Sequence, residues 1–190
     1  MSLHHLPNLL CVLRILLIYP VAHGILVGHY SAVMALFAIA AFTDGLDGFL
    51  AKRFGWHSEL GKVLDPTADK LLLVTVFICL AVVGLVPWWL AGLVLLRDVL
   101  ILFGAHTYKW LFGPVHGEPS AASKFNTLAQ ILFCLAVVAR AAFGGAPGGA
   151  LVTSLGALAT VTTAVSGIDY VLTYSRRAAA VSRARSSATG

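Results

Sequence analysis

Apolar residues along this chain gather in long runs that are separated by short polar or glycine-containing breaks. The runs cover roughly residues 9–28, 31–54, 59–86, 88–112, 120–143 and 148–174. A helix of about 20 apolar residues is long enough to cross a hydrocarbon core about 30 Å thick. Because lipid would leave the backbone of a lone strand unpaired, each run is predicted to be a helix. The pattern predicts an all-α integral membrane protein with six transmembrane helices.

The same pattern predicts a simple domain organisation. Residues 1–175 are expected to form one transmembrane catalytic domain, and residues 176–190, which are small and basic, a disordered cytoplasmic tail. The first apolar run does not resemble a removable signal peptide, because no basic region precedes it and five further runs follow.

Composition and charge agree with a membrane protein. Of the 190 residues, 59% are hydrophobic and only 11% are charged, whereas soluble domains carry about 25% charged residues. The net charge is +5, and six spans would place most basic residues on the side of the two termini. The positive-inside rule assigns that side to the cytoplasm, which predicts a multi-pass inner-membrane protein. Because these charges flank membrane spans, they favour contact with anionic lipid head groups over nucleic-acid binding. The basic residues on this side are Lys52, Arg53, Lys62, Lys109, Lys124, Arg176, Arg177, Arg183 and Arg185.

Four of the eight acidic residues in the chain are aspartates that fall in one short stretch. Asp44, Asp47, Asp65 and Asp69 lie between positions 44 and 69, with Glu59 between the two pairs. Spacings of three and four residues place each pair on one helix face. The break at residues 55–58 makes the two helices antiparallel neighbours, with both pairs about 10–12 Å from the turn. The two pairs are therefore predicted to face each other at one depth.

Four carboxylates so close together repel one another and are costly at membrane depth. Mg²⁺ or Mn²⁺ would offset this charge, since hard divalent cations prefer carboxylate oxygens, and the stretch lacks the cysteines typical of zinc sites. Two such cations about 4 Å apart suit phosphoryl transfer. The alternative is that the aspartates cap helices or pair with Lys52, Lys62 and Lys70.

Small and basic residues surround the aspartates. Gly48, Ala51 and Gly61 would let a bulky polar substrate approach the backbone, and nearby basic residues would neutralise phosphates. Farther along, Arg97 and Asp98 interrupt an apolar run. One interpretation is that they position an acceptor phosphate. The alternative is structural: the arginine extends its charged end toward the membrane surface, and a hydrogen bond joins two helices.

The acidic stretch resembles the signature of the CDP-alcohol phosphotransferase family, D-x2-D-G-x2-A-R-x8-G-x3-D-x3-D. Every spacing is kept. One position departs from the pattern, because Lys52 stands where the signature has arginine, and a lysine cannot bind phosphate through a bidentate fork. The matching residues are Asp44, Asp47, Gly48, Ala51, Lys52, Gly61, Asp65 and Asp69.

The resemblance implies a six-helix fold and a role for each group of residues. It implies that Asp44, Asp47 and Asp65 bind two divalent cations, and that Asp69 is the general base for the acceptor hydroxyl and contacts the second cation. The implied donor-binding residues are Asn8, Thr43, Gly48, Ala51, Lys52 and Gly61. The implied acceptor-binding residues are Arg53, Lys62, Arg97, Lys124 and Asn126.

Within the family, the chain resembles the branch of phosphatidylglycerophosphate synthases and CMP-forming cardiolipin synthases. The motifs Arg97-Asp98-Val99 and 123–127 (SKFNT) are closer to cardiolipin synthases. This implies transfer of a phosphatidyl group from CDP-diacylglycerol to phosphatidylglycerol with release of CMP, in a homodimer. The alternative acceptor is glycerol 3-phosphate.

A function from another class is an ion-coupled transporter, which also uses intramembrane aspartates. Such a transporter predicts inverted repeats and broken helices, and the sequence shows neither. The resemblance leaves Arg14, Asp98 and Asp169 without an assigned role.

Overall fold

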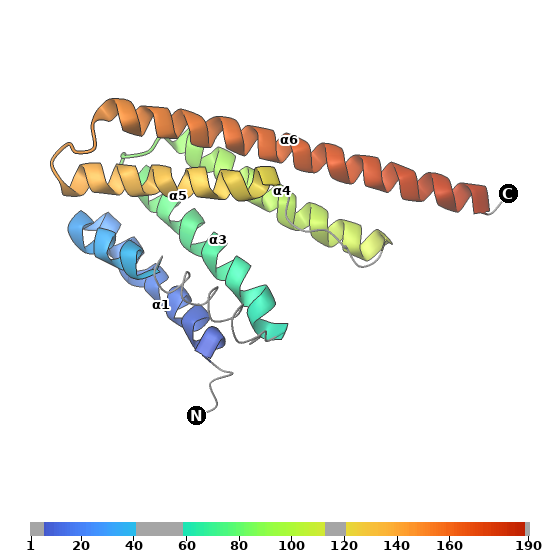
Figure 1. Ribbon diagram of the computed structural model, residues 1–190, viewed down its shortest axis with the longest axis horizontal. Helices are drawn as coiled ribbons and strands as arrows, with labels where there is room; N and C mark the ends of the chain where they lie inside the picture. Colours follow the sequence, from blue (N-terminus) through green and yellow to red (C-terminus); the bar gives the residue numbers. More distant parts are fainter. Residues whose placement is uncertain (1–5, 41–58, 113–120, 189–190) are drawn as a thin grey trace. The chain divides into compact units, whose positions relative to one another are not determined.

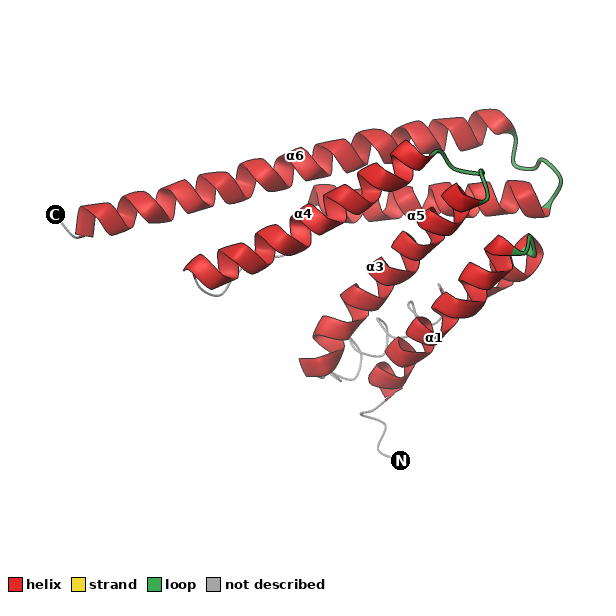
Figure 2. Cartoon of the chain, turned by 180° about the vertical axis from the view of Figure 1, so that it is seen from behind, coloured by secondary structure: helices red, strands yellow, loops and turns green. Residues whose placement is uncertain are grey.

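The described part of the chain is made of helices joined by short turns. The computed structural model describes the backbone of residues 6–40, 59–112 and 121–188, and side chains within residues 12–13, 15–40, 70–104 and 122–173. Figure 2 shows helix and loop but no strand in these ranges, which confirms the all-α class there. The helices are α1 (Leu6–Leu26), the segment Tyr30–Ala40, α3 (Glu59–Val82), α4 (Trp88–Phe112), α5 (Ala121–Ala142) and α6 (Gly149–Ala188) (Figure 1).

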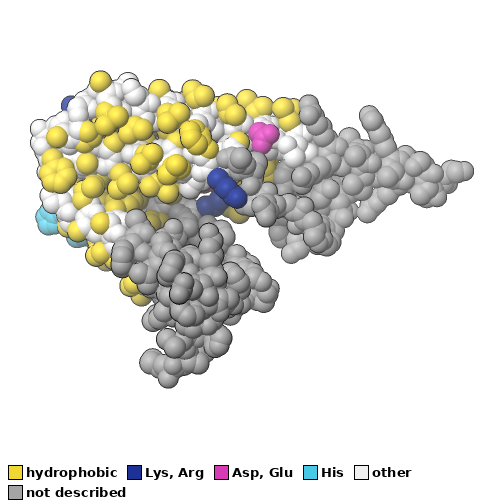
Figure 3. Space-filling model, in the orientation of Figure 1, with side chains coloured by type: hydrophobic (Ala, Val, Ile, Leu, Met, Phe, Trp, Pro, Cys, Tyr) yellow, Lys and Arg dark blue, Asp and Glu magenta, His cyan; other side chains and the backbone are white. Residues whose placement is uncertain are grey.

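Two helical stretches are long and apolar enough to cross a membrane. They are Ala122–Ala142 in α5 and Gly149–Thr173 in α6. Large apolar side chains on α6, such as Val161, Val165 and Ile168, are more than half exposed, and Figure 3 shows hydrophobic side chains spread over the visible described surface. Apolar exposure of this extent fits a lipid surface. The count of six spans stays a prediction.

The structure corrects the prediction for the end of the chain. A disordered tail was expected from residue 176, but α6 continues as one helix of 40 residues to Ala188. The composition of this stretch explains the difference, because alanine and arginine are strong helix formers. Helix nucleation is also already complete in the preceding apolar segment, so extension adds one hydrogen bond per residue.

Glycines end α1 and α3 in the same way. Gly28 and Gly84 have φ angles of 80° and 78°, a left-handed conformation that glycine adopts without steric cost. After α1, the amide of His29 donates to the Gly24 carbonyl at 2.8 Å, and after α3 the amide of Leu85 donates to the Leu80 carbonyl at 2.9 Å. These bonds pair carbonyls that a helix end leaves without partners. The helices end two and four residues before the ends of the apolar runs predicted at 9–28 and 59–86.

Contacts divide the chain into two compact units, which are described separately. The first unit comprises Met1–Ala91 and Cys134–Val152, and the second comprises Gly92–Phe133 and Thr153–Gly190. In the first unit, α1 packs against α3. Its interior is apolar and includes Val21 and Ile25 of α1, Val33 of the next helical segment, and Phe77 and Leu80 of α3.

The second unit contains most of α4, the first half of α5 and most of α6. Its interior differs from that of the first unit, because all the buried polar or charged residues found among the described side chains lie in it. Buried polar groups require hydrogen-bond partners, so this interior is the place to look for specific chemistry. These residues are Arg97, Asp98, Asn126, Gln130, Thr163 and Ser166.

A close approach of α4 and α6 in the second unit gives a testable packing prediction. A Cβ atom at Gly104 would lie 2.7 Å from Cε1 of Tyr170, whose hydroxyl donates to the Ile101 carbonyl at 2.9 Å. Gly104→Ala is therefore expected to lower the free energy of unfolding by about 1–3 kcal/mol through overpacking. Thermal or denaturant unfolding of the detergent-solubilised protein measures this loss.

The matched control is Gly92→Ala, which lies on the same helix and has no neighbouring atom within 4 Å of the added Cβ. It is expected to be neutral or to stabilise the helix by up to about 1 kcal/mol, because alanine has the higher helix propensity. Equal unfolding curves for the two variants would contradict the packing of Gly104 against Tyr170.

Candidate functional site

Two of the four signature aspartates lie on α3. Asp65 and Asp69 fall within Glu59–Val82, and four residues of helix correspond to about 6 Å along its axis. This spacing places both positions on one helix face, as predicted. Oxygen ligands one turn apart fit a hard divalent cation. The positions of Asp44 and Asp47 lie outside the described residues, so the meeting of the two pairs stays a prediction.

The other predicted site residues divide between three parts of the chain. Asn8 on α1 and Gly61 and Lys62 on α3 are described by their backbone alone. Arg97 on α4 and Lys124 and Asn126 on α5 are described with their side chains. Among the side chains described, no three His, Cys, Asp or Glu residues are placed to hold a metal ion. Outside the described residues lie Thr43, Gly48, Ala51, Lys52 and Arg53.

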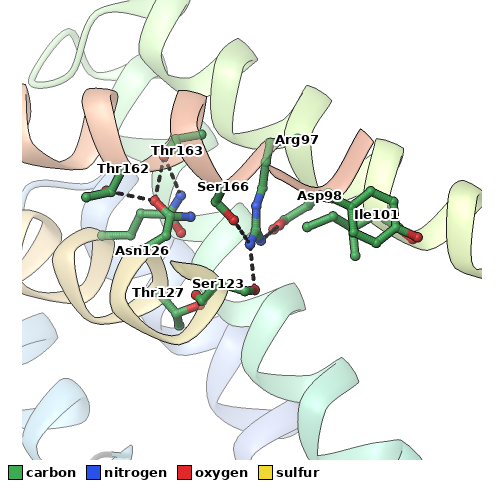
Figure 4. A network of polar contacts seen from close by, with 11 residues as sticks. Arg97, Asp98, Ile101, Ser123, Asn126, Thr127, Thr162, Thr163 and Ser166 are labelled. Carbon is green, nitrogen blue, oxygen red and sulfur yellow. Dashed lines mark hydrogen bonds and ion pairs between the residues drawn. The ribbon is translucent and has the colours of Figure 1, made fainter. Parts of the chain in front are cut away.

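Arg97 is the centre of a buried polar cluster in the second unit (Figure 4). Its Nη1 donates to Oδ1 of the neighbouring Asp98 at 2.6 Å. Its Nη2 donates to the hydroxyls of Ser123 on α5 at 2.6 Å and Ser166 on α6 at 2.7 Å. The Arg97 and Asp98 side chains are 4% and 7% exposed. Three helices thus converge on one guanidinium, whose planar fork provides donors in several directions.

A second group of polar residues joins α5 to α6. The hydroxyls of Thr162 and Thr163 each donate to Oδ1 of Asn126 at 2.9 Å. Thr163 in turn accepts a hydrogen bond from Nε2 of Gln130 at 3.0 Å. Asn126 and Gln130 are one turn apart on α5, so the chain of bonds follows one face of that helix. This chain fixes the rotation and register of α5 against α6 in the second unit.

The two groups adjoin each other along the same helices. Ser123 precedes Asn126 by three residues on α5, and Ser166 follows Thr163 by three residues on α6, so in each helix the two residues share a face. Among the described side chains, two buried donor atoms have no hydrogen-bond partner, Nε of Arg97 and Nδ2 of Asn126. An unpaired buried donor costs about 1–3 kcal/mol. Each such group calls for a physical explanation, such as strain, an ordered water molecule or ion, or a functional role.

The structure separates the predicted acceptor residues into buried and exposed ones. Arg97 and Asn126 are buried, whereas Lys124, between Ser123 and Asn126 on α5, is exposed.

The sequence analysis did not predict the hydrogen-bond partners on α5 and α6, although polar residues at helical spacing in an apolar run were a usable signal. It also left Asp98 unassigned, and the structure identifies it as the ion-pair partner of Arg97. The missed residues are Ser123, Gln130, Thr162, Thr163 and Ser166.

Comparisons with known proteins agree with the sequence signature. The family model for CDP-alcohol phosphatidyltransferase matches residues 4–175. A probable CMP-forming cardiolipin synthase of Drosophila melanogaster is 34% identical over 142 residues, covering 66% of this chain and 44% of that protein. A chloroplastic CDP-diacylglycerol–glycerol-3-phosphate 3-phosphatidyltransferase of Oryza sativa subsp. japonica is 32% identical over 189 residues, covering 90% of this chain and 57% of that protein.

A probable phosphatidylglycerophosphate synthase of Mycobacterium tuberculosis is 37% identical over 101 residues, which cover 50% of this chain and 48% of that protein. The chain thus spans about half the length of the curated relatives that it matches. The match to the family model nonetheless covers nearly all of the chain, including the aspartate signature and the Arg97 cluster. This chain belongs to the CDP-alcohol phosphatidyltransferase family.

Proposed function

We propose that this protein is a metal-dependent phosphatidyltransferase of phospholipid biosynthesis. It transfers the phosphatidyl group of CDP-diacylglycerol to the hydroxyl of phosphatidylglycerol, which yields cardiolipin and CMP. The observation that carries the proposal is the placement of Asp65 and Asp69 one turn apart on α3, in a chain that keeps every spacing of the signature. The family match and the cardiolipin synthases among the relatives support it.

The reaction assigns distinct tasks to the aspartates. Asp44, Asp47, Asp65 and Asp69 would hold two divalent cations, Mg²⁺ or Mn²⁺, which when bound stabilise the negative charge of the pyrophosphate as its P–O bond breaks. Asp69 accepts the proton of the acceptor hydroxyl. The acceptor oxygen then forms a bond to the phosphorus of the phosphatidyl group, and CMP leaves with the electron pair of the broken bond.

The remaining residues bind the two substrates. Small residues of the signature allow the cytidine nucleotide to approach the backbone, and basic side chains offset the charge of its phosphates. On the acceptor side, Arg97 and Asn126 present buried donors to a head group, together with Lys124 at the surface. The proposed donor-binding residues are Asn8, Thr43, Gly48, Ala51, Lys52 and Gly61, and the further acceptor residues are Arg53 and Lys62.

The proposal includes a location and an assembly. We propose that the chain is a multi-pass protein of the inner membrane with its site facing the cytoplasm, because six spans would place most basic residues on the side of the termini. Two membrane-capable helices are consistent with this location. A homodimer is proposed on the family resemblance alone.

The second candidate is a phosphatidylglycerophosphate synthase, which would use glycerol 3-phosphate in place of phosphatidylglycerol. The rice relative, which aligns with 90% of this chain and whose name includes this acceptor, favours it. An ion-coupled transporter is disfavoured, because the family match accounts for the aspartates.

The test uses purified protein with CDP-diacylglycerol and either phosphatidylglycerol or glycerol 3-phosphate, in the presence of Mg²⁺ or Mn²⁺. Release of CMP and formation of cardiolipin are expected with phosphatidylglycerol, and both should stop when EDTA removes the cations. Phosphatidylglycerophosphate as the only product would favour the second candidate. No CMP release with either acceptor would contradict the proposed activity.

A further inference from the structure

The hydrogen bonds around Asn126 determine which way its carboxamide faces. We propose that Thr163 and Gln130 are positioning residues, which hold Asn126 so that its Nδ2 donates to an oxygen of the acceptor head group. This inference rests on the proposed function, because it takes Asn126 as part of the acceptor site. It goes beyond that function by assigning a role to two further residues. It applies to either candidate acceptor, since both contain phosphate and glycerol oxygens.

The first argument is the orientation of the Asn126 carboxamide, which has an oxygen that accepts and an amino group that donates. The hydroxyls of Thr162 and Thr163 both donate to Oδ1 at 2.9 Å (Figure 4). Two donors at Oδ1 place the amino group on the other branch of the carboxamide. Among the described side chains, this amino group, Nδ2, is a buried donor without a partner.

The second argument is the direction of the hydrogen bonds. The Thr163 oxygen accepts a bond from Nε2 of Gln130 at 3.0 Å, and its single proton goes to Oδ1 of Asn126. Gln130, Thr163 and Asn126 thus form a chain of donors that runs in one direction and ends at the carboxamide. Thr162 contributes less, because its one proton is shared between Oδ1 and two carbonyls of its own helix, at 2.9 and 3.2 Å.

The third argument is burial. Asn126 and Thr163 are 0% exposed and Gln130 is 1% exposed, so water competes little for these bonds. An unpaired buried donor costs free energy, and a head-group oxygen that accepts from Nδ2 removes this cost. A carboxamide that is already held in place also loses less conformational entropy on binding. Because Nδ2 is buried, the head group reaches it only when neighbouring side chains make room.

Thr163→Val tests the assignment, because it keeps the shape of the side chain and removes the hydroxyl. The KM for the acceptor is expected to rise about three- to tenfold, the effect of weakening one hydrogen bond. The KM for CDP-diacylglycerol should change by less than about twofold, since the donor binds elsewhere. Thr163→Ser keeps the hydroxyl and should restore the KM for the acceptor. A raised KM in the serine variant would contradict the inference.

The matched control is Thr160→Val, which makes the same chemical change on the same helix. The Thr160 hydroxyl donates within α6, to the carbonyl of Gly156 at 2.8 Å, so this variant should leave the KM for the acceptor unchanged. Equal values for the two valine variants would overturn the inference. So would a Thr163→Val variant that is less stable but has the KM of the wild type, because the hydroxyl would then serve packing alone.

A double-mutant cycle tests whether Thr163 acts through Asn126. In an Asn126→Leu background, Thr163→Val should raise the KM for the acceptor no further, because the group that it positions is gone. The same additional rise as in the wild-type background would show that Thr163 acts independently, which contradicts a positioning role.

A second variant covers the case in which Thr163→Val does not fold because Nε2 of Gln130 loses its acceptor. Gln130→Leu/Thr163→Val replaces both partners by apolar groups, which avoids an unpaired buried donor between them. It is expected to show the same rise in the KM for the acceptor. A double variant with the KM of the wild type would count against both positioning residues.

A binding measurement separates this inference from the proposed activity. The soluble head groups glycerophosphoglycerol and glycerol 3-phosphate are titrated against the full-length protein, with thermal stabilisation as the readout. Thr163→Val should require a higher head-group concentration than the wild type, and Thr160→Val should not. If the wild type releases no CMP but this difference is found, the activity is wrong and the positioning holds. If CMP is released but all variants bind equally, the activity holds and the positioning is wrong.

Discussion

Asp69→Asn is expected to reduce phosphatidyl transfer by at least about 100-fold, because an amide cannot take the proton of the acceptor hydroxyl. The substitution keeps the shape of the side chain and one oxygen that can contact a cation. Binding of CDP-diacylglycerol is therefore expected to persist. CMP release measures the first effect, and retention of the cytidine nucleotide in the presence of Mn²⁺ measures the second.

Two outcomes would change the role of Asp69. Full activity of the variant would remove Asp69 as the general base. Loss of nucleotide binding together with activity would limit the role of Asp69 to cation binding, like that of the other three aspartates. Asp169→Asn provides the control for a carboxylate-to-amide change away from α3, and it should retain both activity and nucleotide binding.

Arg97→Met is expected to lower the free energy of unfolding by about 3–5 kcal/mol, because it leaves the buried carboxylate of Asp98 without its guanidinium. Both side chains are less than a tenth exposed, so water does not replace the lost partner. The hydroxyls of Ser123 and Ser166 lose a donor as well. Unfolding of the detergent-solubilised variant, followed by circular dichroism, measures the effect.

The double variant Arg97→Met/Asp98→Leu distinguishes an unpaired charge from a simple loss of packing. Replacing both members of a buried ion pair by apolar residues is often neutral or stabilising, so the double variant is expected to be more stable than Arg97→Met. A double variant as unstable as the single one would contradict this explanation. Lys124→Met, at an exposed position of α5, should change stability by less than about 0.5 kcal/mol.

The positions of the helices followed from the sequence because they depend on local patterns. Runs of apolar residues predicted α4 at 88–112, and the structure has Trp88–Phe112; they predicted a helix at 120–143, and α5 is Ala121–Ala142. Glycine and proline near residues 28 and 84–87 marked breaks where helices end. The prediction for the end of α6 was wrong. The small and basic residues there were interpreted as a sign of disorder, although alanine and arginine favour extension of a helix.

The candidate site was predictable to different degrees in its two parts. The spacing of Asp65 and Asp69 within the signature, and their place on one helix, could be read from the sequence because an i,i+4 relation is local. The Arg97 cluster was visible there only as charged and polar residues within apolar runs. Its members are far apart in the chain, since Ser123 lies 26 residues and Ser166 69 residues from Arg97.

The four aspartates, their helical spacing and their family signature were thus determined by the sequence itself, because each depends on residues at most 25 positions apart and on one helical period. The tertiary structure decided that Arg97 pairs with Asp98, that Ser123 and Ser166 complete its bonds, and that Asn126 is held by Thr162 and Thr163. The physical reason is that the partners of a buried polar side chain depend on how each helix is rotated about its axis and shifted along its neighbour. Packing of the helices in the second unit sets both.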